Sequence, residues 1–197
     1  TPQEAYDLFP IMNLQGVKGA AYLPTDGYAD PSMITHALAR GARNGGVTIK
    51  RGLRVTGVKV DIKNATELQT DQGIVKAEFV INAAGMWARE FGAMAGVNVP
   101  LIAVEHQFMV TEPISGLPKN LPTMRDPDNL IYYKQEVGGL VMGGYEPNPI
   151  AWSTQGIPTN FGQELLESKF DHFEQLANKA IFRTPCLETA GVARLIN

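Results

Sequence analysis

The chain has 197 residues, of which 44% are hydrophobic and 19% charged, and its formal net charge is -3; these values are ordinary for a globular protein. The charge gives no basic footprint for nucleic acid, and no apolar run approaches the roughly 20 residues that cross a bilayer. The single cysteine, Cys186, excludes an internal disulfide and a cysteine-rich metal site, and no His-x-x-x-His spacing occurs. We therefore expect no nucleic acid, no membrane and no metal.

Helices and strands alternate in the first half of the chain. Thr1-Pro2-Gln3-Glu4 has the form of a capping box with proline at the first helical position. Asp30-Pro31 opens a second helix, which Gly45 ends. The expected core face of this helix carries four apolar residues: Met33, Ile34, Ala37 and Leu38. Further patterns predict four strands and then a helix: Val47–Lys50, Leu53–Ile62, Thr66–Thr70 and Phe79–Ala83, followed by Met86–Ala95.

Long extended runs replace this pattern after Pro100. The predicted strands are Leu101–Thr111, Asn129–Glu136, Leu140–Tyr145 and Leu187–Ile196, and Val137-Gly138-Gly139 joins the middle two as a hairpin. Leu165, Leu166, Phe170, Phe173 and Leu176 form the apolar stripe of a helix over residues 163–179. The fold class expected is α/β followed by α+β. Residues 1–99 are expected to form an α/β domain, and residues 100–197 an antiparallel sheet with a covering helix.

The two ends of the chain are typical of a segment of a longer protein. The first residue is Thr1 and no targeting leader follows, while the last residues, Ala-Arg-Leu-Ile-Asn, interrupt a predicted strand. We therefore expect an internal fragment.

Residues 79–87, Phe-Val-Ile-Asn-Ala-Ala-Gly-Met-Trp, are an apolar run that ends in small residues and leads into a helical pattern. Ligands of open α/β sheets lie at the carboxyl ends of the strands, and small residues let the backbone approach a flat or phosphorylated group. The same small residues also suit a plain packing contact between a strand and a helix. Both interpretations are open at this point.

Several further motifs follow this turn in order: Glu105-His106-Gln107-Phe108, Met124-Arg125-Asp126, Ile131-Tyr132-Tyr133 and Gly143–Pro149. Together with the turn they resemble the FAD-dependent amine oxidoreductases of the D-amino-acid oxidase superfamily. Within it the likeness is greatest to sarcosine and dimethylglycine dehydrogenases, and it extends from about Gly27 to the end. The resemblance implies FAD as cofactor and an N-methyl amine substrate, such as sarcosine or dimethylglycine, that is oxidised by hydride transfer to the flavin.

The resemblance also implies which residues bind the cofactor. It assigns a backbone contact with the adenine to Val55, which is alternatively a core valine. It places Ala83, Ala84 and Gly85 beside the ribityl and pyrophosphate region, with Trp87 either walling the site or anchoring its helix. The family's Gly-x-Gly-x-x-Gly is missing, since none of the 20 glycines are spaced as Gly-x-Gly. Residues 1–99 would then be a partial FAD-binding domain, and the isolated fragment is expected to be inactive.

In the second half the resemblance points to a substrate-binding sheet that roofs the flavin ring. His106 and Phe108 alternate along one strand and share a face. His106 is then a catalytic and substrate-binding candidate, or alternatively a structural histidine. Many relatives have tyrosine at the position of Phe108. Because phenylalanine lacks the hydroxyl, we assign Phe108 to substrate binding and not to catalysis. Tyr132 and Tyr133 point to opposite faces, and Tyr133 is our choice as the catalytic and substrate-binding residue.

The resemblance carries three further expectations. A folate-binding domain would follow this chain and intercept the oxidised product. The location would be cytoplasmic in a bacterium or the mitochondrial matrix. The alternative to an enzyme is a non-catalytic regulatory subunit that keeps the flavoprotein fold, which the absent hydroxyl at Phe108 favours.

Overall fold

The computed structural model describes residues 1–60, 66–162 and 164–197, and it forms two compact units. Unit 1 comprises Thr1–Ala29, Glu105–Ile150 and residues 164–197, and unit 2 comprises Asp30–Val104 and Ala151–Gly162. All strand pairings in the described residues are antiparallel. Helices mixed with antiparallel sheets confirm the predicted fold class. The predicted domain boundary between residues 99 and 100 stays a prediction.

Unit 1 is built on a five-stranded antiparallel sheet in the order β10-β5-β8-β7-β6. The predicted hairpin is confirmed, because β7 and β8 pair along their whole length and are joined by Val137 and Gly138. Both turn residues have positive φ, 45° and 80°, as the two-residue turns that match strand twist require. The strands of the sheet are β5 (Phe108–Thr111), β6 (Met124–Asp126), β7 (Ile131–Glu136), β8 (Gly139–Gly144) and β10 (Val192–Ile196).

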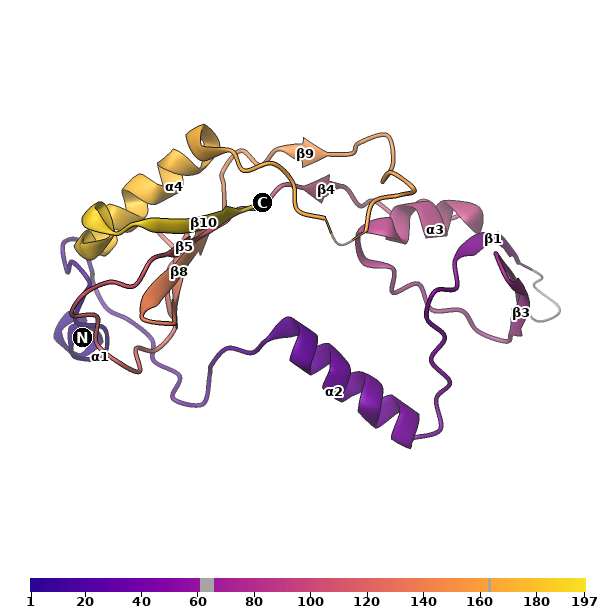
Figure 1. Cartoon of the computed structure of the whole chain (residues 1–197), viewed down its shortest axis with the longest axis horizontal. Helices are drawn as coiled ribbons and strands as arrows, with labels where there is room; N and C mark the ends of the chain where they lie inside the picture. The colour runs from indigo at the N-terminus through magenta and orange to yellow at the C-terminus, as the bar shows by residue number, and fades with distance from the viewer. Residues whose placement is uncertain (61–65, 163) are drawn as a thin grey trace. The chain divides into compact units, whose positions relative to one another are not determined.

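One face of this sheet is covered by α4 (Phe170–Arg183), the yellow-orange helix of Figure 1, which packs against β7 and β8. Side chains alternate between the two faces of a strand, so every second residue of β7 and β8 points to α4. These residues pack with the apolar stripe of α4 and with Phe9, which follows α1 (Pro2–Leu8) and its confirmed capping box. The buried set is Phe9, Ile131, Tyr133, Leu140, Met142, Phe173, Leu176 and Ala180.

A buried ion pair fastens the end of α4 to the sheet. Arg183 Nε donates to Oδ2 of Asp126 in β6 at 2.7 Å, and the two side chains are 8% and 10% exposed. Arg183 Nη1 also donates to the backbone oxygens of Asn13 and Gln15, so one guanidinium joins three parts of unit 1. Burial alone would raise the pKa of Asp126. The hydrogen bonds from Asn129 and Arg183 outweigh it, and the pKa lies below its ordinary value.

Unit 2 contains a three-stranded meander against which a short helix packs. The order is β1-β2-β3, with α3 against β1. A second helix, α2, begins at Asp30 as predicted, where Oδ1 accepts a hydrogen bond from Met33 N at 2.7 Å. The elements are α2 (Pro31–Asn44), β1 (Val55–Lys59), β2 (Thr66–Thr70), β3 (Gly73–Ala77), the 3-10 turn η1 (Gly85–Trp87), α3 (Ala88–Met94), β4 (Ala103–Val104) and β9 (Ala151–Trp152).

Three predictions about unit 2 are wrong. Residues 47–50 and 79–83 form no strands, because no strand among the described residues pairs with them. Phe79 and Ile81 are 82% and 87% exposed. The expected core face of α2 is also uncovered, with Met33 and Leu38 both 70% exposed. The strand predicted over Leu53–Ile62 forms as β1, and its last two residues lie outside the described residues.

Three predictions about elements after residue 100 need correction for identifiable reasons. The run Leu101–Thr111 is divided into β4 and β5, because Gln107 N donates to the Glu146 carboxylate instead of to a strand. The helix predicted over residues 163–179 begins at Phe170, since Leu166 N and Ser168 Oγ bind the backbone oxygens of Asn197 and Leu195 along β10. Gln163 lies outside the described residues.

The last predicted strand, Leu187–Ile196, also begins later than expected. Pro185–Thr189 forms a 3-10 turn, η2, and β10 starts at Val192. Proline at the first position of η2 supplies no N–H for a ladder and has the φ that a helical turn needs.

Replacing Arg183 by leucine is expected to destabilise unit 1 by about 3–5 kcal/mol, because Asp126 would remain buried without its partner. Scanning calorimetry of the protein that contains this chain measures the effect. The control is Lys76→Ala, which removes an exposed ion pair with Glu67 (3.0 Å, Lys76 67% exposed) and should cost less than about 1 kcal/mol.

Acid should remove the contribution of this ion pair. The pKa of Asp126 is lower in the folded state than its unfolded value of about 4, so the stability is present above that pH and is lost as the pH falls through the folded pKa.

An Arg183→Leu protein as stable as the unmodified one would contradict the role assigned to the ion pair.

Candidate functional site

The candidate substrate site is the face of the five-stranded sheet opposite α4. Directly paired residues of neighbouring strands share a face. Phe108 of β5 pairs with Gly143 of β8, and Gly143 pairs with Tyr132 of β7. This row lies one residue out of phase with the buried Met142 and Tyr133. The structure therefore brings Phe108 and Tyr132 to the face that α4 leaves open.

Gly143 in the middle of this row lets Tyr132 lie across the strand. A Cβ built at Gly143 would come within 2.3 Å of the Tyr132 hydroxyl oxygen and 2.4 Å of its ring. Tyr132 continues into a chain of rings, with centroid distances of 5.9 Å to Tyr145 and 5.8 Å from Tyr145 to His106. Burial raises the pKa of Tyr132, and Tyr145 and Glu146 add to the rise, so the phenol keeps its proton and can donate it in a hydrogen bond.

His106 precedes β5 and stands at the end of this chain of rings. Its Nδ1 lies 3.2 Å from Oε2 of Glu146, and its side chain is 42% exposed, whereas that of Glu146 is 5% exposed. The other ring nitrogen forms no hydrogen bond with the described residues. An imidazole that is held on one side and open on the other can exchange a proton with a bound molecule.

Tyr133 lies on the opposite face of the sheet, under α4. Its side chain is 1% exposed, and its hydroxyl donates to the backbone oxygen of Ala180 at 3.0 Å. Burial raises the pKa of this phenol far above its ordinary value. Our sequence-based choice between the two tyrosines thus selected the one that α4 covers. The missed signal is the two-residue period of β7, which places Tyr132 on the same face as the charged Lys134 and Glu136.

Cations lie at two edges of the open face. Arg125 of β6 pairs with Tyr132, and Arg194 of β10 pairs with Val110 of β5. Neither arginine forms an ion pair within the described residues, whereas Lys134 is 2.7 Å from Glu136. Arg125 and Arg194 can therefore bind a carboxylate. No sequence pattern singled out Arg194.

The predicted cofactor residues lie together in unit 2. Asn82 Oδ1 accepts from Ala84 N at 3.2 Å and Asn82 Nδ2 donates to the Ala88 oxygen at 2.9 Å, which fixes the turn into α3. Ala83 and Gly85 are exposed, and open space surrounds the position of a Cβ at Gly85, whose φ is 55°. Bare backbone of this kind fits the close approach of a dinucleotide.

Val55 and Trp87 flank this turn from neighbouring elements. Val55 is half-buried at the start of β1, and Trp87 is 38% exposed at the start of α3, which packs against β1. Both alternatives for each residue, cofactor contact or packing, are compatible with these positions, and the roles stay predictions.

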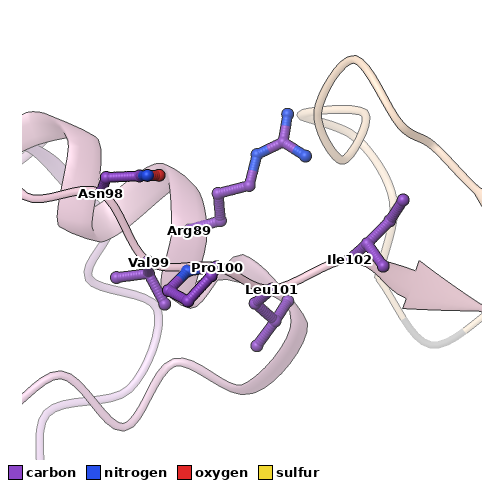
Figure 2. A pocket seen from close by; sticks show the side chains of 6 residues that line it. All are labelled: Arg89, Asn98, Val99, Pro100, Leu101 and Ile102. Atoms are coloured by element: carbon purple, nitrogen blue, oxygen red, sulfur yellow. The ribbon is translucent and has the colours of Figure 1, made fainter.

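The hollows on the surface do not coincide with these residues. Figure 2 shows one of about 300 Å³ in unit 2, where Arg89 extends from α3 beside the stretch from Asn98 to Ile102. A second, of about 690 Å³, lies in unit 1 between Tyr28, the loop after Pro113 and the β7–β8 turn. None of the sequence-predicted site residues lines either hollow.

Other kinds of site find little support in the described residues. They contain no group of three histidine, cysteine, aspartate or glutamate residues placed to hold a metal. None of their helices has the length and apolar character needed to span a bilayer. Burial raises the pKa of the Cys186 thiol, which makes this cysteine a poor nucleophile.

The family model of FAD dependent oxidoreductases matches residues 1–190. The chain therefore belongs to this family, and the predicted family and its cofactor, FAD, are confirmed. Among solved structures it is similar to L-proline dehydrogenase from P. horikoshii, with a TM-score of 0.78 and 26% identity over 100% of this chain and 50% of that one.

Three curated relatives are similar over almost the whole chain. Dimethylglycine dehydrogenase of Rattus norvegicus is 38% identical over 204 residues, with 100% of this chain and 24% of that protein covered. Sarcosine dehydrogenase of Mus musculus is 36% identical over 197 residues (98% and 21%). The pyruvate dehydrogenase phosphatase regulatory subunit of Mus musculus is 34% identical over 200 residues (100% and 23%). All three are named as mitochondrial proteins, and the chain spans about a quarter of their length.

Replacing Gly143 by alanine is expected to displace Tyr132 and to disturb the open face, while the buried apolar side chains under α4 are retained. The rate of flavin reduction by substrate in the whole protein should fall about tenfold or more, as misplacement of a contacting group does. Stopped-flow absorbance measures this rate. The matched control is Gly41→Ala in α2, where a Cβ meets nothing within 4 Å. Equal rates for the two variants would show that the open face is not the site.

Proposed function

We propose that the protein containing this chain is an FAD-dependent oxidoreductase that oxidises an N-methyl amine such as sarcosine or dimethylglycine. The observation that carries the proposal is the open sheet face with Phe108, Tyr132 and His106 in one connected row. Membership of the FAD family and the 36–38% identity to sarcosine and dimethylglycine dehydrogenases support this choice of substrate class.

The two units would supply different parts of the reaction. Ala83, Ala84 and Gly85 would hold the cofactor through their backbone, with Val55 and Trp87 beside it. When bound, FAD supplies a two-electron acceptor for hydride from the N-methyl carbon. The remaining tasks, binding and orienting the amine and adjusting its protonation, fall to the open face of unit 1.

The open face suits an amino acid with a methylated nitrogen. The rings of Phe108, Tyr132 and Tyr145 can hold an ammonium group on entry. Oxidation requires the neutral amine, and the free nitrogen of His106 can accept its proton. Arg125 or Arg194 would bind the substrate carboxylate.

Two parts of the proposal concern the surroundings of the enzyme. A folate-binding domain downstream would receive the oxidised one-carbon unit, as the resemblance implies. The mitochondrial relatives support the mitochondrial matrix as the location in a eukaryote, with the cytoplasm as the counterpart in a bacterium.

A second candidate function is that of a non-catalytic regulatory subunit. The 34% identity to the pyruvate dehydrogenase phosphatase regulatory subunit favours it, as does the absence of a hydroxyl at Phe108. Such a protein would keep the sheet and the ring contacts but would not transfer hydride from an amine.

Sarcosine or dimethylglycine is expected to bleach the flavin of the full-length protein under anaerobic conditions, because hydride transfer reduces the isoalloxazine ring. Visible absorbance during titration with each amine measures the effect, with glycine as the unmethylated control. Bleaching by an unrelated amine or acid alone would sink the substrate assignment. A flavin that no N-methyl amine bleaches would favour the regulatory subunit.

A further inference from the structure

Glu146 follows β8 and is an enclosed ionisable group beside His106. Its side chain is 5% exposed, although the residue lies beside Tyr145, which is 51% exposed. Its two oxygens accept from two different donors: Oε2 from His106 Nδ1 at 3.2 Å and Oε1 from Gln107 N at 3.3 Å. One carboxylate therefore binds both the imidazole and the next backbone amide.

The contact with Glu146 fixes which nitrogen of His106 carries the proton. A carboxylate oxygen only accepts hydrogen bonds, so a neutral imidazole beside it is protonated at Nδ1. The second nitrogen, Nε2, is then left with its lone pair on the exposed side of the ring. In the opposite tautomer Nδ1 would meet the carboxylate with a lone pair, which is repulsive.

The residues on either side of His106, Glu105 and Gln107, form hydrogen bonds with Lys169 and Asn197 and not with Glu146 through their side chains. Gln107, which is 1% exposed, accepts from Lys169 N at 2.7 Å and donates to the Lys169 oxygen at 3.3 Å. Glu105 accepts from Lys169 Nζ at 2.8 Å and from Asn197 Nδ2 at 2.9 Å. These bonds anchor the side chains of Glu105 and Gln107, whereas the hydrogen bond recorded for the His106 ring within the described residues is the one to Glu146.

We propose that Glu146 is a positioning residue that holds His106 as the Nδ1-protonated tautomer, with Nε2 presented to the amine substrate. This inference rests on the proposed function of the open face. Glu146 touches the substrate at no point in this scheme and acts through His106 alone. Among the described residues, the titratable groups in contact with the imidazole are Glu146, 3.2 Å from Nδ1, and Tyr145, whose ring centroid lies 5.8 Å away; Tyr132 lies beyond Tyr145.

The test uses the full-length flavoprotein and a double-mutant cycle. Glu146→Leu keeps the volume but removes both acceptors, and it should slow anaerobic flavin reduction by dimethylglycine about 10- to 100-fold. Glu146→Gln retains one acceptor oxygen and should recover part of that loss. In a His106→Ala background, Glu146→Leu should add less than about twofold, because a residue that acts through His106 has nothing left to position.

A spectroscopic measurement separates positioning from a general loss of structure. Histidine-selective ¹⁵N labelling should give the shifts of an Nδ1-protonated imidazole for His106, assigned by their loss in His106→Ala. Glu146→Leu should move them towards the other tautomer. The matched control, Glu105→Leu, removes a buried carboxylate on the opposite side of the same segment and should leave the tautomer unchanged.

The possible outcomes distinguish this inference from the function on which it rests. Full flavin reduction in His106→Ala would remove His106 from the reaction and with it the proposed role of the open face. A slow His106→Ala protein with an unimpaired Glu146→Leu protein would overturn the role of Glu146 alone. The same would follow if Glu146→Leu and Glu105→Leu gave equal tautomer shifts, since the effect would then be structural.

Discussion

The packing of α4 on one face of the five-stranded sheet is the constraint on which the candidate site depends. It buries every second residue of β7 and β8, and the Arg183–Asp126 ion pair fixes the end of the helix against the edge of the sheet. Because side chains of a strand alternate, the covered residues also decide which residues face away. Tyr133 is a core residue and Tyr132 a candidate site residue for this single reason.

The open face shows how a few main-chain features organise polar side chains. Gly143 has no side chain, so Tyr132 crosses β8 and joins Tyr145 and His106. The chain leaves the regular ladder before β5, and Gln107 N turns to the carboxylate of Glu146. The interruption that ends one strand early is therefore the same feature that holds the imidazole in place.

Elements whose start or turn depends on a few neighbouring residues were predicted correctly from the sequence. The capping box at Thr1, the Asp30 helix start and the β7–β8 turn each depend on a few neighbouring residues, and all three formed. Partners distant in the sequence decided the rest. Residues 79–83 lack a neighbouring strand among the described residues, and the residues before Phe170 bind the edge of β10 instead of forming a helical turn. The role of Glu146 was hidden for the same reason, since 40 positions separate it from His106.

The discontinuous construction of unit 1 has a consequence for the order of folding. Arg183 and Asn13, which it binds, are 170 positions apart, and β5 must wait for β10 near the end of the chain. Closing such long loops is slow, whereas the β1–β2–β3 meander of unit 2 needs only neighbouring residues. During synthesis the meander can pair early, while the sheet that carries His106 has no cover for its apolar face until α4 emerges. During this interval the uncovered apolar face is open to aggregation and to binding by chaperones.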